Sequence, residues 1–283
     1  MQHTIKPNAF KSSARHYRSI FISDIHLGTR GCQADKLLDF LKKTESDVLY
    51  LVGDIVDGWR LKKSWYWPQS HNDVIQKILR KARKGTKVIY VPGNHDEMLR
   101  KYYGTHFGGI EVRETDIYTD ARGKRFWILH GDAFDNIFQH ARWIVYLGDN
   151  AYTFLIWFNR RFNQIRSLLG LKYWSLSAFL KHKVKNAVQF IGEFEKTVTA
   201  QARQRSVDGV ICGHIHHATI QTFEDISYMN DGDWVESCTA LVEHHDGRWE
   251  ILHWLDIADQ FLAHDGDEEV EAEPALGAVD GRA

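Results

Sequence analysis

From Tyr17 to about Leu129 the chain alternates short apolar runs with amphipathic stretches, and this alternation constrains its fold more than any other feature. The apolar runs have the length of strands, whereas the stretches between them place apolar residues at helical spacing. We therefore predict strands at residues 19–23, 48–52 and 87–91, and helices at residues 34–43 and 73–84. Strands that alternate with helices in this order are typical of an α/β sandwich.

Further strand patterns follow in the second part of the chain. Residues 117–118 and 125–129 form a hairpin-like pair around the turn signal at residues 120–123. Beyond a long amphipathic stretch, we predict strands at residues 207–212, 218–223 and 234–237, and a hairpin around Asp246 and Gly247. These elements would complete the sandwich.

One segment has a different composition from the rest of the sandwich. Residues 134–190 contain 13 of the 36 aromatic residues of the chain, together with a surplus of basic residues. We interpret this segment as a helical cap inserted into a single domain at residues 17–264. Its aromatic side chains either line an acyl groove or face a membrane surface, or they form the core of the cap while its charges are solvated.

The two ends of the chain do not resemble a folded domain. Residues 1–16 precede the strand pattern and are predicted to be a flexible N-terminus. Residues 265–283 begin with an acidic run, lack large aromatic side chains and end in small residues. Such a composition cannot bury a core, so we expect a disordered acidic tail.

Five short polar motifs each follow a predicted strand. They are Asp24-Ile25-His26, Gly53-Asp54 with Asp57 following, Gly93-Asn94-His95-Asp96, His130-Gly131-Asp132 and Gly213-His214-Ile215-His216. Ligand sites of α/β sheets gather at the carboxyl ends of strands. We therefore expect these motifs, which lie far apart in the sequence, to converge on one crevice.

The residue types in these motifs are those that bind divalent metal ions: carboxylates, an amide oxygen and imidazoles, without a thiolate. Asp24 and His26 are two positions apart and would face one ion if their segment stays extended. His214 and His216 have the same spacing, with Ile215 pointing into apolar packing between them. These two histidines could serve two ions.

Each motif also has a simpler explanation. Gly93 followed by Asn94 is a turn signal, and an Asp after Gly at a strand end, such as Asp54, is commonly a helix N-cap. A lone His such as His130 is commonly a surface or hydrogen-bonded core residue. Five motifs in one order at strand ends are hard to assign to turns and caps. We therefore predict a metal site, with Asp54 as the bridging carboxylate.

The five motifs resemble the signature of the calcineurin-like metallophosphoesterase superfamily, and the resemblance covers the chain from Ser19 to Trp254. It implies a four-layer α/β/β/α sandwich that binds two metal ions. One ion would be held by Asp24, His26, Asp54 and His216, and the other by Asp54, Asn94, His130 and His214. His95 is similar to the residue that contacts the substrate phosphate and protonates the leaving group. His95 and Asp54 are thus the candidate catalytic residues.

Hydrolysis of a phosphoester explains why two ions are needed. A phosphodiester or pyrophosphate is anionic and repels hydroxide, so the reaction needs both a strong nucleophile and neutralisation of charge. Two divalent ions about 3.5–4 Å apart supply both. His95 lies outside the implied ligand set and is free to donate a proton to the departing oxygen. Asp57 or Asp96 would orient it, or would simply form a cap or an ion pair.

Within this superfamily the chain most resembles the branch of the UDP-2,3-diacylglucosamine pyrophosphatases of lipid A biosynthesis. The shared features are the Ser-Asp-Ile-His-Leu start, the Leu-Val-Gly-Asp-Ile strand end, the His-Gly-Asp motif and an insertion before Gly-His-Ile-His. This resemblance implies cleavage of a lipid-linked nucleotide to UMP and an acylated sugar phosphate, commonly with Mn²⁺, with Fe or Zn as alternatives. One position departs from the branch, because His95 stands where the well-known lipid A enzymes have Arg.

Candidate substrate contacts are Asn94, His95, Arg160, Arg161, Lys181 and Lys185. Two other interpretations stay open. A phosphodiesterase or pyrophosphatase for another nucleotide or lipid would keep all seven metal ligands and differ only in the cap. A non-catalytic scaffold would typically have lost ligands, and here every ligand position is filled.

Charge and cysteine content bear on the partners and the compartment. The formal net charge is −1, which gives no broad electrostatic footprint for a nucleic acid. Cys32, Cys212 and Cys238 are few, odd in number and not at zinc-motif spacing, as expected in a reducing compartment. Neither a secretory signal nor a bilayer-spanning stretch is visible. We therefore expect a cytoplasmic protein with a peripheral contact to the inner membrane surface.

Overall fold

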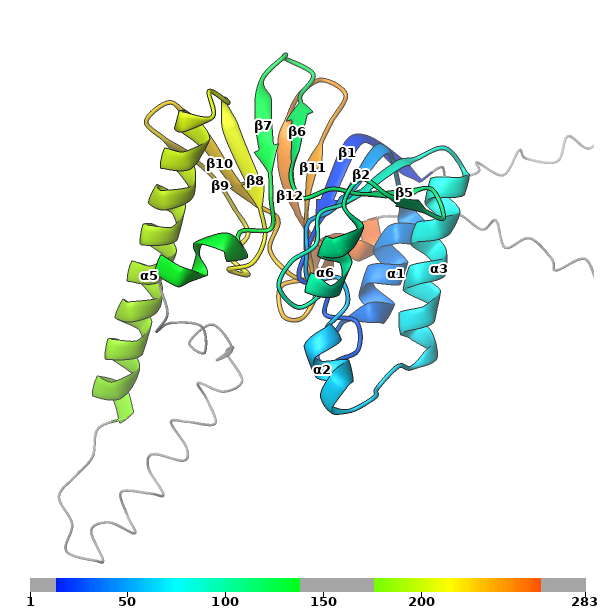
Figure 1. The fold of residues 1–283 in the computed structure, drawn as a ribbon, viewed down its shortest axis with the longest axis horizontal. Coiled ribbons are helices and arrows are strands. Elements are labelled where there is room, and N and C mark those ends of the chain that lie inside the picture. Colours follow the sequence, from blue (N-terminus) through cyan, green and yellow to red (C-terminus); the bar gives the residue numbers. More distant parts are fainter. Residues whose placement is uncertain (1–13, 138–175, 261–283) are drawn as a thin grey trace, which may run out of the picture.

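The computed structural model describes residues 14–137 and 176–260 (Figure 1). Within these residues the strands form two sheets, and the larger one has the order β12-β11-β1-β2-β3-β5-β4. Its strands are β1 Arg15–Ile22, β2 Thr44–Leu51, β3 Lys87–Tyr90, β4 His106–Phe107, β5 Ile110–Val112, β11 Thr239–Glu243 and β12 Trp249–His253. Since β1, β2, β3 and β5 run parallel, their carboxyl ends meet at one edge of the sheet.

The smaller sheet has the order β6-β7-β8-β10-β9 within the described residues. Its strands are β6 Asp116–Thr119, β7 Arg125–Ile128, β8 Gly209–Cys212, β9 Thr219–Phe223 and β10 Ile226–Asn230. β7, β8 and β10 run parallel to one another. This sheet therefore also gathers the carboxyl ends of several strands at one edge.

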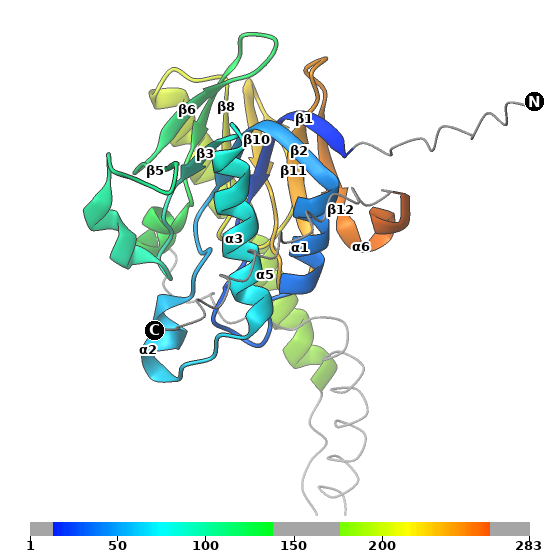
Figure 2. The ribbon, with the colours of Figure 1, turned by 90° about the vertical axis from the view of Figure 1, so that its right-hand side faces the viewer.

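Several helices accompany the two sheets in the described residues. They are α1 Ala34–Lys43, α2 Gly58–Lys63, α3 Gln69–Arg83, α5 Leu176–Gln204 and α6 Trp254–Ile257, with the 3₁₀ helices η1 Glu97–Tyr102, η2 Asp132–Ile137 and η3 Ala258–Gln260. Figures 1 and 2 show α1 and α3 side by side against the larger sheet, and α5 beside the smaller one. In α1, Leu37, Phe40 and Leu41 share one buried face. Burial of this apolar stripe is why the predicted helix forms there.

Three clusters of buried side chains hold the sheets and helices together. Phe21 and Tyr50 stack with ring centroids 4.8 Å apart in the cluster between the two sheets. Phe40 belongs to the cluster between the larger sheet and its helices, and Phe194 of α5 to the cluster on the smaller sheet. Truncation of one such buried aromatic to alanine typically costs about 3–5 kcal/mol. The mixed α/β fold class predicted from the sequence is confirmed.

Most predicted elements are present with shifted ends. The helix at residues 34–43 has its predicted bounds, and the helix predicted at residues 73–84 begins earlier, at Gln69. The hairpin around Asp246 and Gly247 joins β11 to β12. β1 begins at Arg15, so the last two residues of the predicted flexible segment, residues 1–16, belong to a strand.

The predicted strand at residues 234–237 is wrong. These residues form a turn, because Asp233 Oδ1 accepts hydrogen bonds from the backbone N–H groups of Val235 at 2.8 Å and Glu236 at 2.6 Å. Trp234 is nevertheless fully buried, and its ring centroid lies 5.2 Å from that of Phe40. Its apolar character reflects core packing in a turn and not a strand.

Several predictions fall outside the described residues. Most of the predicted cap at residues 134–190, including Arg160 and Arg161, lies there, as does the tail at residues 265–283. Lys181 and Lys185 are placed only as backbone positions of α5. In the described part of the chain, no helix is both long and apolar enough to cross a membrane.

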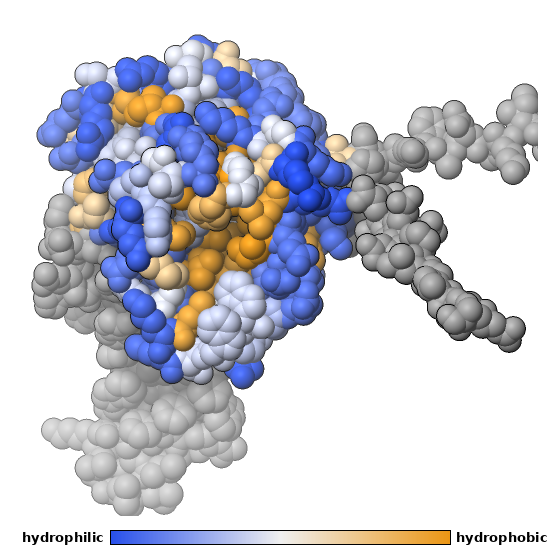
Figure 3. Space-filling view, turned by 45° about the vertical axis from the view of Figure 1, so that its right-hand side comes forward, coloured by the Kyte–Doolittle hydropathy of each residue, from blue (hydrophilic) through white to orange (hydrophobic). Residues whose placement is uncertain are grey.

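The surface is largely hydrophilic but contains apolar positions near the loops. Figure 3 shows one face on which hydrophobic residues lie in a hollowed band with hydrophilic residues around it. Trp65, after α2, and Met98 and Tyr102, in η1, are among the large exposed side chains. These aromatic and apolar groups lie in or next to segments that follow β2 and β3, whose carboxyl ends carry two of the polar motifs.

Candidate metal centre

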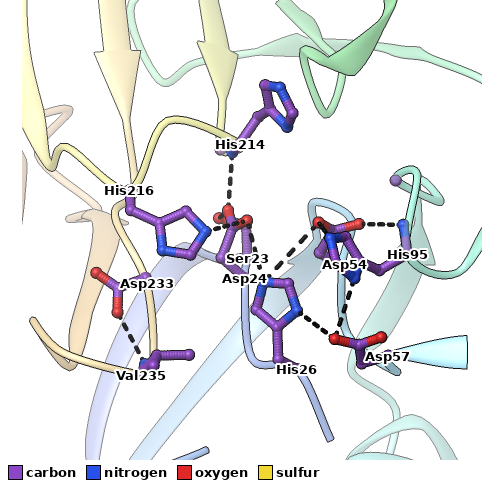
Figure 4. A network of polar contacts seen from close by, with 12 residues as sticks. Ser23, Asp24, His26, Asp54, Asp57, His95, His214, His216, Asp233 and Val235 are labelled. Carbon is purple, nitrogen blue, oxygen red and sulfur yellow. Dashed lines mark hydrogen bonds and ion pairs between the residues drawn. The ribbon is translucent and has the colours of Figure 1, made fainter. Parts of the chain in front are cut away.

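The five predicted motifs meet where parallel strands of both sheets end. The segments that carry them follow β1, β2 and β3 of the larger sheet and β7 and β8 of the smaller one. Figure 4 shows Asp24, His26, Asp54, His214 and His216 arranged around one centre on loops from both sheets. The convergence expected from the sequence is therefore present.

Backbone hydrogen bonds fix the first two motifs beside each other. The N–H of Asp24 donates to the carbonyl of Gly53 at 3.0 Å, and the N–H of His26 donates to the carbonyl of Asp54 at 2.9 Å. The carbonyl of Asp24 in turn accepts from the N–H of Trp234 at 3.1 Å. These bonds hold the motif segments in place although the regular sheet pairing of β1 and β2 has already ended.

The residues around this centre share an unusual backbone conformation. Asp24, His26, Asp54, His214 and His216 have φ angles between 50° and 71°. Residues other than glycine rarely adopt this left-handed conformation, which costs about 1–3 kcal/mol each. The expectation that Asp24 and His26 lie on an extended segment is therefore wrong. Strain of this kind at clustered polar residues is typical of a functional site.

The first of two side-chain groups consists of Asp24, His26 and His216. Asp24 Oδ1 lies 3.0 Å from His216 Nε2 and 3.8 Å from His26 Nε2. Ligand atoms of the three residues all lie within 4.8 Å of one another. An ion of ordinary coordination radius would therefore be within reach of all three side chains after small adjustments.

The second group consists of Asp54, His130 and His214. Asp54 Oδ2 lies 3.4 Å from His130 Nε2, and the three ligand atoms again lie within 4.8 Å of one another. Asp54 Oδ2 also lies 3.9 Å from His26 Nε2, so this carboxylate contacts both groups. Ile215 is buried in the core of the smaller sheet, as predicted, which separates the directions of its two histidine neighbours.

Buried polar atoms at this centre fit the binding of metal ions. Asp24 Oδ1, His26 Nε2, His130 Nε2 and both side-chain heteroatoms of Asn94 make no hydrogen bond of regular geometry among the described residues, although carboxylates and imidazoles face one another there. Leaving such an atom unpaired costs about 1–3 kcal/mol. His130 Nδ1 lies 2.8 Å from the carbonyl of Val52, which leaves Nε2 to face the centre. Oxygen and imidazole donors in these positions suit divalent ions.

Glycine is required at two positions by close packing around the centre. A Cβ atom on Gly93 would lie 2.3 Å from Asp54 Oδ1, and a Cβ atom on Gly53 would lie 2.3 Å from His130 Nδ1. Gly53 also has a φ of 83°. The glycines of the two motifs therefore let the backbone approach the side chains that form the centre.

The electrostatics of the centre favour ionised carboxylates and positive charge. Burial raises the pKa of Asp54, but the charge of His130 and the hydrogen bond with it lower the pKa to about 2. Burial lowers the pKa of His26, whereas hydrogen bonds to Asp24 and Asp57 raise it to about 10. Divalent ions would replace the protons on these imidazoles, because a histidine ligand must be neutral at the coordinating nitrogen.

His95 lies at the edge of the centre, outside the two groups above, but its ligand atom lies within 4.8 Å of those of His26 and Asp57, which form a third group with it. Its Nδ1 lies 3.0 Å from Asp57 Oδ2 and its Nε2 lies 3.9 Å from Asp54 Oδ2. Its backbone N–H donates to Asp54 Oδ1 at 2.8 Å, and its ring centroid lies 4.5 Å from that of Trp59. Asp57 also caps α2, because its Oδ1 accepts from the N–H of Arg60 at 2.7 Å. Asp57 therefore caps α2 and also contacts His95, so the capping role is observed and the orienting role stays a prediction.

Asp96 has a different role from Asp57. Its carboxylate accepts hydrogen bonds from the backbone N–H of Ile55 at 2.8 Å, from the N–H of Gly93 and from the hydroxyl of Tyr90. The side chain is fully buried. Asp96 thus joins the loop after β3 to the motif after β2, and the option that it orients His95 is not what the structure shows.

A buried hydrogen-bond chain behind Asp24 was not predicted from the sequence. Ser23 Oγ lies 2.6 Å from both Asp24 Oδ2 and Asp231 Oδ1. A hydroxyl group has one hydrogen to donate, so it serves only one of these carboxyl groups. Burial raises the pKa of Asp231 well above its usual range. Ser23 thus links Asp24 to Asp231, and Ser23 Oγ also lies 3.1 Å from the carbonyl of Gly232. The raised pKa favours a protonated Asp231 that could donate to Ser23. The place of Asp231 after a parallel strand was the one available signal.

The sequence matches the family described as calcineurin-like phosphoesterase over residues 17–218, a range that contains all five motifs. The chain belongs to this family. Calcineurin-like phosphoesterases use a dimetal centre, and the clustered Asp and His side chains form the corresponding site here. The chain is accordingly a metal-dependent phosphoesterase.

Relatives of this calcineurin-like phosphoesterase carry the name UDP-2,3-diacylglucosamine hydrolase. The protein of that name from Vibrio atlanticus (strain LGP32) is 26% identical over 237 residues, which cover 80% of this chain and 93% of the relative. That from Xanthomonas campestris pv. campestris is 26% identical over 247 residues, which cover 81% and 96%. A solved Thermotoga maritima protein is 14% identical with a TM-score of 0.41, covering 84% of this chain and 99% of that protein.

Proposed function

We propose that this phosphoesterase hydrolyses UDP-2,3-diacylglucosamine to UMP and 2,3-diacylglucosamine 1-phosphate. One P–O bond of the diphosphate breaks, and water supplies the oxygen and the protons that complete the two products. The observation that carries the proposal is the pair of side-chain groups joined by Asp54, with His95 beside them. The names of the relatives, which cover about four fifths of the chain, support this substrate.

The proposed ligand sets follow the two side-chain groups. One ion would be held by Asp24, His26, Asp54 and His216, and the other by Asp54, Asn94, His130 and His214. When bound, two divalent ions lower the pKa of water and neutralise the charge of the phosphoryl group. Asp54 would bridge them, and the unpaired atoms of Asn94 support its place beside the second group. The donor set suits Mn²⁺, with Fe or Zn as alternatives.

His95 would donate a hydrogen bond or a proton to the departing phosphate oxygen. Asp57 favours this role, because a carboxylate 3.0 Å from Nδ1 orients the ring. Nε2 is the nitrogen that faces Asp54 and therefore the centre. Asn94 and His95 would contact the phosphoryl oxygens, and Arg160, Arg161, Lys181 and Lys185 remain predicted contacts of the cap.

The lipid portion of the substrate bears on where the enzyme works. We infer a cytoplasmic enzyme with a peripheral contact to the inner membrane surface, where an acylated nucleotide would be found. The aromatic and basic composition of residues 134–190 supports this location.

A different phosphoester substrate is the second candidate. His95 occupies the position of an Arg in the lipid A branch, so a phosphodiesterase or pyrophosphatase acting on another nucleotide or lipid would use the same centre. A non-catalytic scaffold agrees less well with the site, since every implied ligand is present and buried or half-buried at one place.

Three substrates tested side by side separate these possibilities. We would measure Mn²⁺-dependent hydrolysis of UDP-2,3-diacylglucosamine, of a water-soluble UDP-sugar and of bis(p-nitrophenyl) phosphate, with the Asp54→Ala protein as blank. A strong preference for the acylated substrate is expected. Activity on the other two substrates alone would keep the metal chemistry and reject the lipid substrate, and no activity on any would favour the scaffold.

A further inference from the structure

A pocket of about 460 Å³ lies directly beside the metal centre. It is formed by the segment after β1, by α2 and by the loop that follows α2. His26 and Asp57 line both the pocket and the centre. A chemical group bound in this pocket would therefore be adjacent to the reacting phosphoryl group.

The other side chains of the pocket combine cations with aromatic rings. The guanidinium carbon of Arg30 lies 4.5 Å from the ring centroid of Tyr66, which fixes that charge over an aromatic face. Trp65 is 75% exposed at the same pocket, and Arg60 lines it from α2. Planar bases stack on exposed aromatic faces, and guanidinium groups pair with phosphate oxygens. The lining thus suits a ligand with both a planar ring and a phosphate.

The pocket and helix α5 approach the centre from different sides. The pocket reaches it through His26 and Asp57, whereas the Phe194 ring of α5 lies 6.2 Å from that of His214. Figure 1 likewise shows α2 and α5 on opposite sides of the loops that carry the motifs. A substrate whose diphosphate sits at the centre can therefore extend in two directions, one of which is this pocket.

We propose that the pocket binds the nucleoside monophosphate half of the substrate. The base would stack on the exposed ring of Trp65, and the phosphate of the nucleotide would pair with Arg30, whose guanidinium lies over the ring of Tyr66. Acyl chains suit this pocket poorly, because its charged residues Arg30, Arg60 and Asp57 would lose hydration without gaining partners. The assignment rests on the proposed function, since it presumes a nucleotide diphosphate at the centre.

Binding of UMP to the intact Mn²⁺-loaded protein tests the assignment without requiring turnover. We would measure the dissociation constants of UMP and ribose 5-phosphate by calorimetry. Ribose 5-phosphate is the comparison ligand because it has the phosphate and the sugar but no base. The wild-type protein should bind UMP at least about tenfold more tightly than ribose 5-phosphate, a difference within the range of one base–aromatic stack. Trp65→Ala should remove most of that preference, and Trp65→Phe should restore part of it.

Arginine variants test the phosphate half of the assignment. Arg30→Ala should lower the affinity for both ligands by about tenfold, as expected for loss of a charge-assisted contact. Lys62→Ala is the matched control, because Lys62 is an exposed basic residue of α2, the helix next to the pocket, and does not line the pocket. Its affinities should stay at the wild-type values. All variants replace exposed or half-exposed side chains, so thermal unfolding should confirm that they fold.

The outcomes separate this assignment from the proposed function. Equal binding of UMP and ribose 5-phosphate, or a base preference that survives Trp65→Ala, would overturn the assignment. If UMP binding depends on Trp65 but UDP-2,3-diacylglucosamine is not hydrolysed, the pocket assignment stands and the proposed substrate fails. If UDP-2,3-diacylglucosamine is hydrolysed but the Trp65 and Arg30 variants bind UMP as tightly as the wild type, the proposed substrate is supported and the pocket assignment fails.

Discussion

His95 Nδ1 and Asp57 Oδ2 lie 3.0 Å apart, and this contact ties the one motif histidine outside the two proposed ligand sets to the residue that caps α2. The same carboxylate oxygen lies 3.3 Å from His26 Nδ1. Asp57 thus fixes both a proposed ligand and the proposed acid. Capping of α2 by its other oxygen holds this carboxylate in one orientation.

Replacement of His95 by Ala should slow turnover while leaving the metals in place. We expect kcat to fall by about 10²–10⁴-fold, the usual contribution of a positioned general acid. Metal content measured by plasma mass spectrometry should equal that of the wild type, because His95 belongs to neither ligand group. Loss of metal from His95→Ala would show that it is a ligand and not an acid.

Asp54→Ala should abolish hydrolysis by removing the carboxylate that contacts both groups. Affinity for Mn²⁺ should fall by more than about 100-fold, since loss of a residue that merely supports a ligand already costs 10–100-fold. Mn²⁺ titration followed by calorimetry would measure this loss. Asp35→Ala, at an exposed carboxylate of α1, provides the control and should bind Mn²⁺ normally. Unchanged affinity in Asp54→Ala would reject the bridging role.

Asp231 should tolerate Asn far better than Ala. The Asn amide can donate to Ser23 Oγ as the protonated carboxyl group does, so the hydrogen bond from Ser23 to Asp24 would be kept. We expect Asp231→Asn to bind Mn²⁺ within a few-fold of the wild type. Asp231→Ala and Ser23→Ala should each weaken binding by about 10–100-fold. Equal effects of the Asn and Ala substitutions would mean that Asp231 does not act as a donor.

Stability should depend on pH through His71. Burial lowers the pKa of His71, and its Nδ1 accepts a hydrogen bond from the N–H of Gly28 at 3.0 Å, which requires the neutral ring. In the unfolded chain the pKa is about 6.5. Because the folded-state pKa is the lower one, the stabilisation is present above about pH 6.5 and is lost as the pH falls through the folded-state value.

Comparison with His71→Gln would isolate this contribution. The free energy of unfolding, measured by chemical denaturation between pH 5 and pH 8, should favour the wild type most at the upper end. The difference in unfolding free energy between the two proteins should shrink as the pH falls, because protonation of His71 then favours the unfolded chain. Other histidines titrate in both proteins and cancel in the comparison. A difference that stays constant over this range would show that His71 does not titrate on unfolding.

Deletion of residues 265–283 should leave kcat and KM for the substrate unchanged. This segment begins with an acidic run, contains no aromatic residue and has few large apolar side chains with which to pack on the domain. Steady-state kinetics of the truncated and full-length proteins, at equal metal loading, would test the prediction. A large loss of turnover in the truncated protein would assign the tail a catalytic or folding role.

The sequence predicted the strands that carry the five motifs because periodicity and burial agreed, but it missed α2 and the strands β4, β5 and β10. The helix at residues 34–43 has an apolar stripe that the sheet covers, and the apolar runs before the motifs became buried parallel strands. The failure at residues 234–237 has a local cause. The Asp233 side chain accepts several backbone hydrogen bonds and turns the chain, so an apolar run that reads as a strand is a buried turn.

The site was predictable in its residue types but not in its geometry. The motifs identified which side chains gather, because strand ends collect polar residues. The left-handed backbone at Asp24 and His26 could not be predicted, since it depends on hydrogen bonds to the segment after β2. Asp231 was missed because its role arises from a contact through Ser23 with a residue more than 200 positions away. Such contacts exist only once the two sheets have packed.

The left-handed backbone of the residues at the metal centre lowers the stability of the metal-free fold, whereas the side chains at these positions are needed to bind the ions for hydrolysis. Glycine adopts this conformation without steric cost, so in the metal-free chain it would relieve backbone strain at a position such as His214. A mutant library selected only for heat resistance without metal would therefore drift toward glycine there and lose the enzyme. The same library selected in the presence of the ions would keep the acidic and imidazole side chains, because the binding energy of the ions is then part of the folding energy.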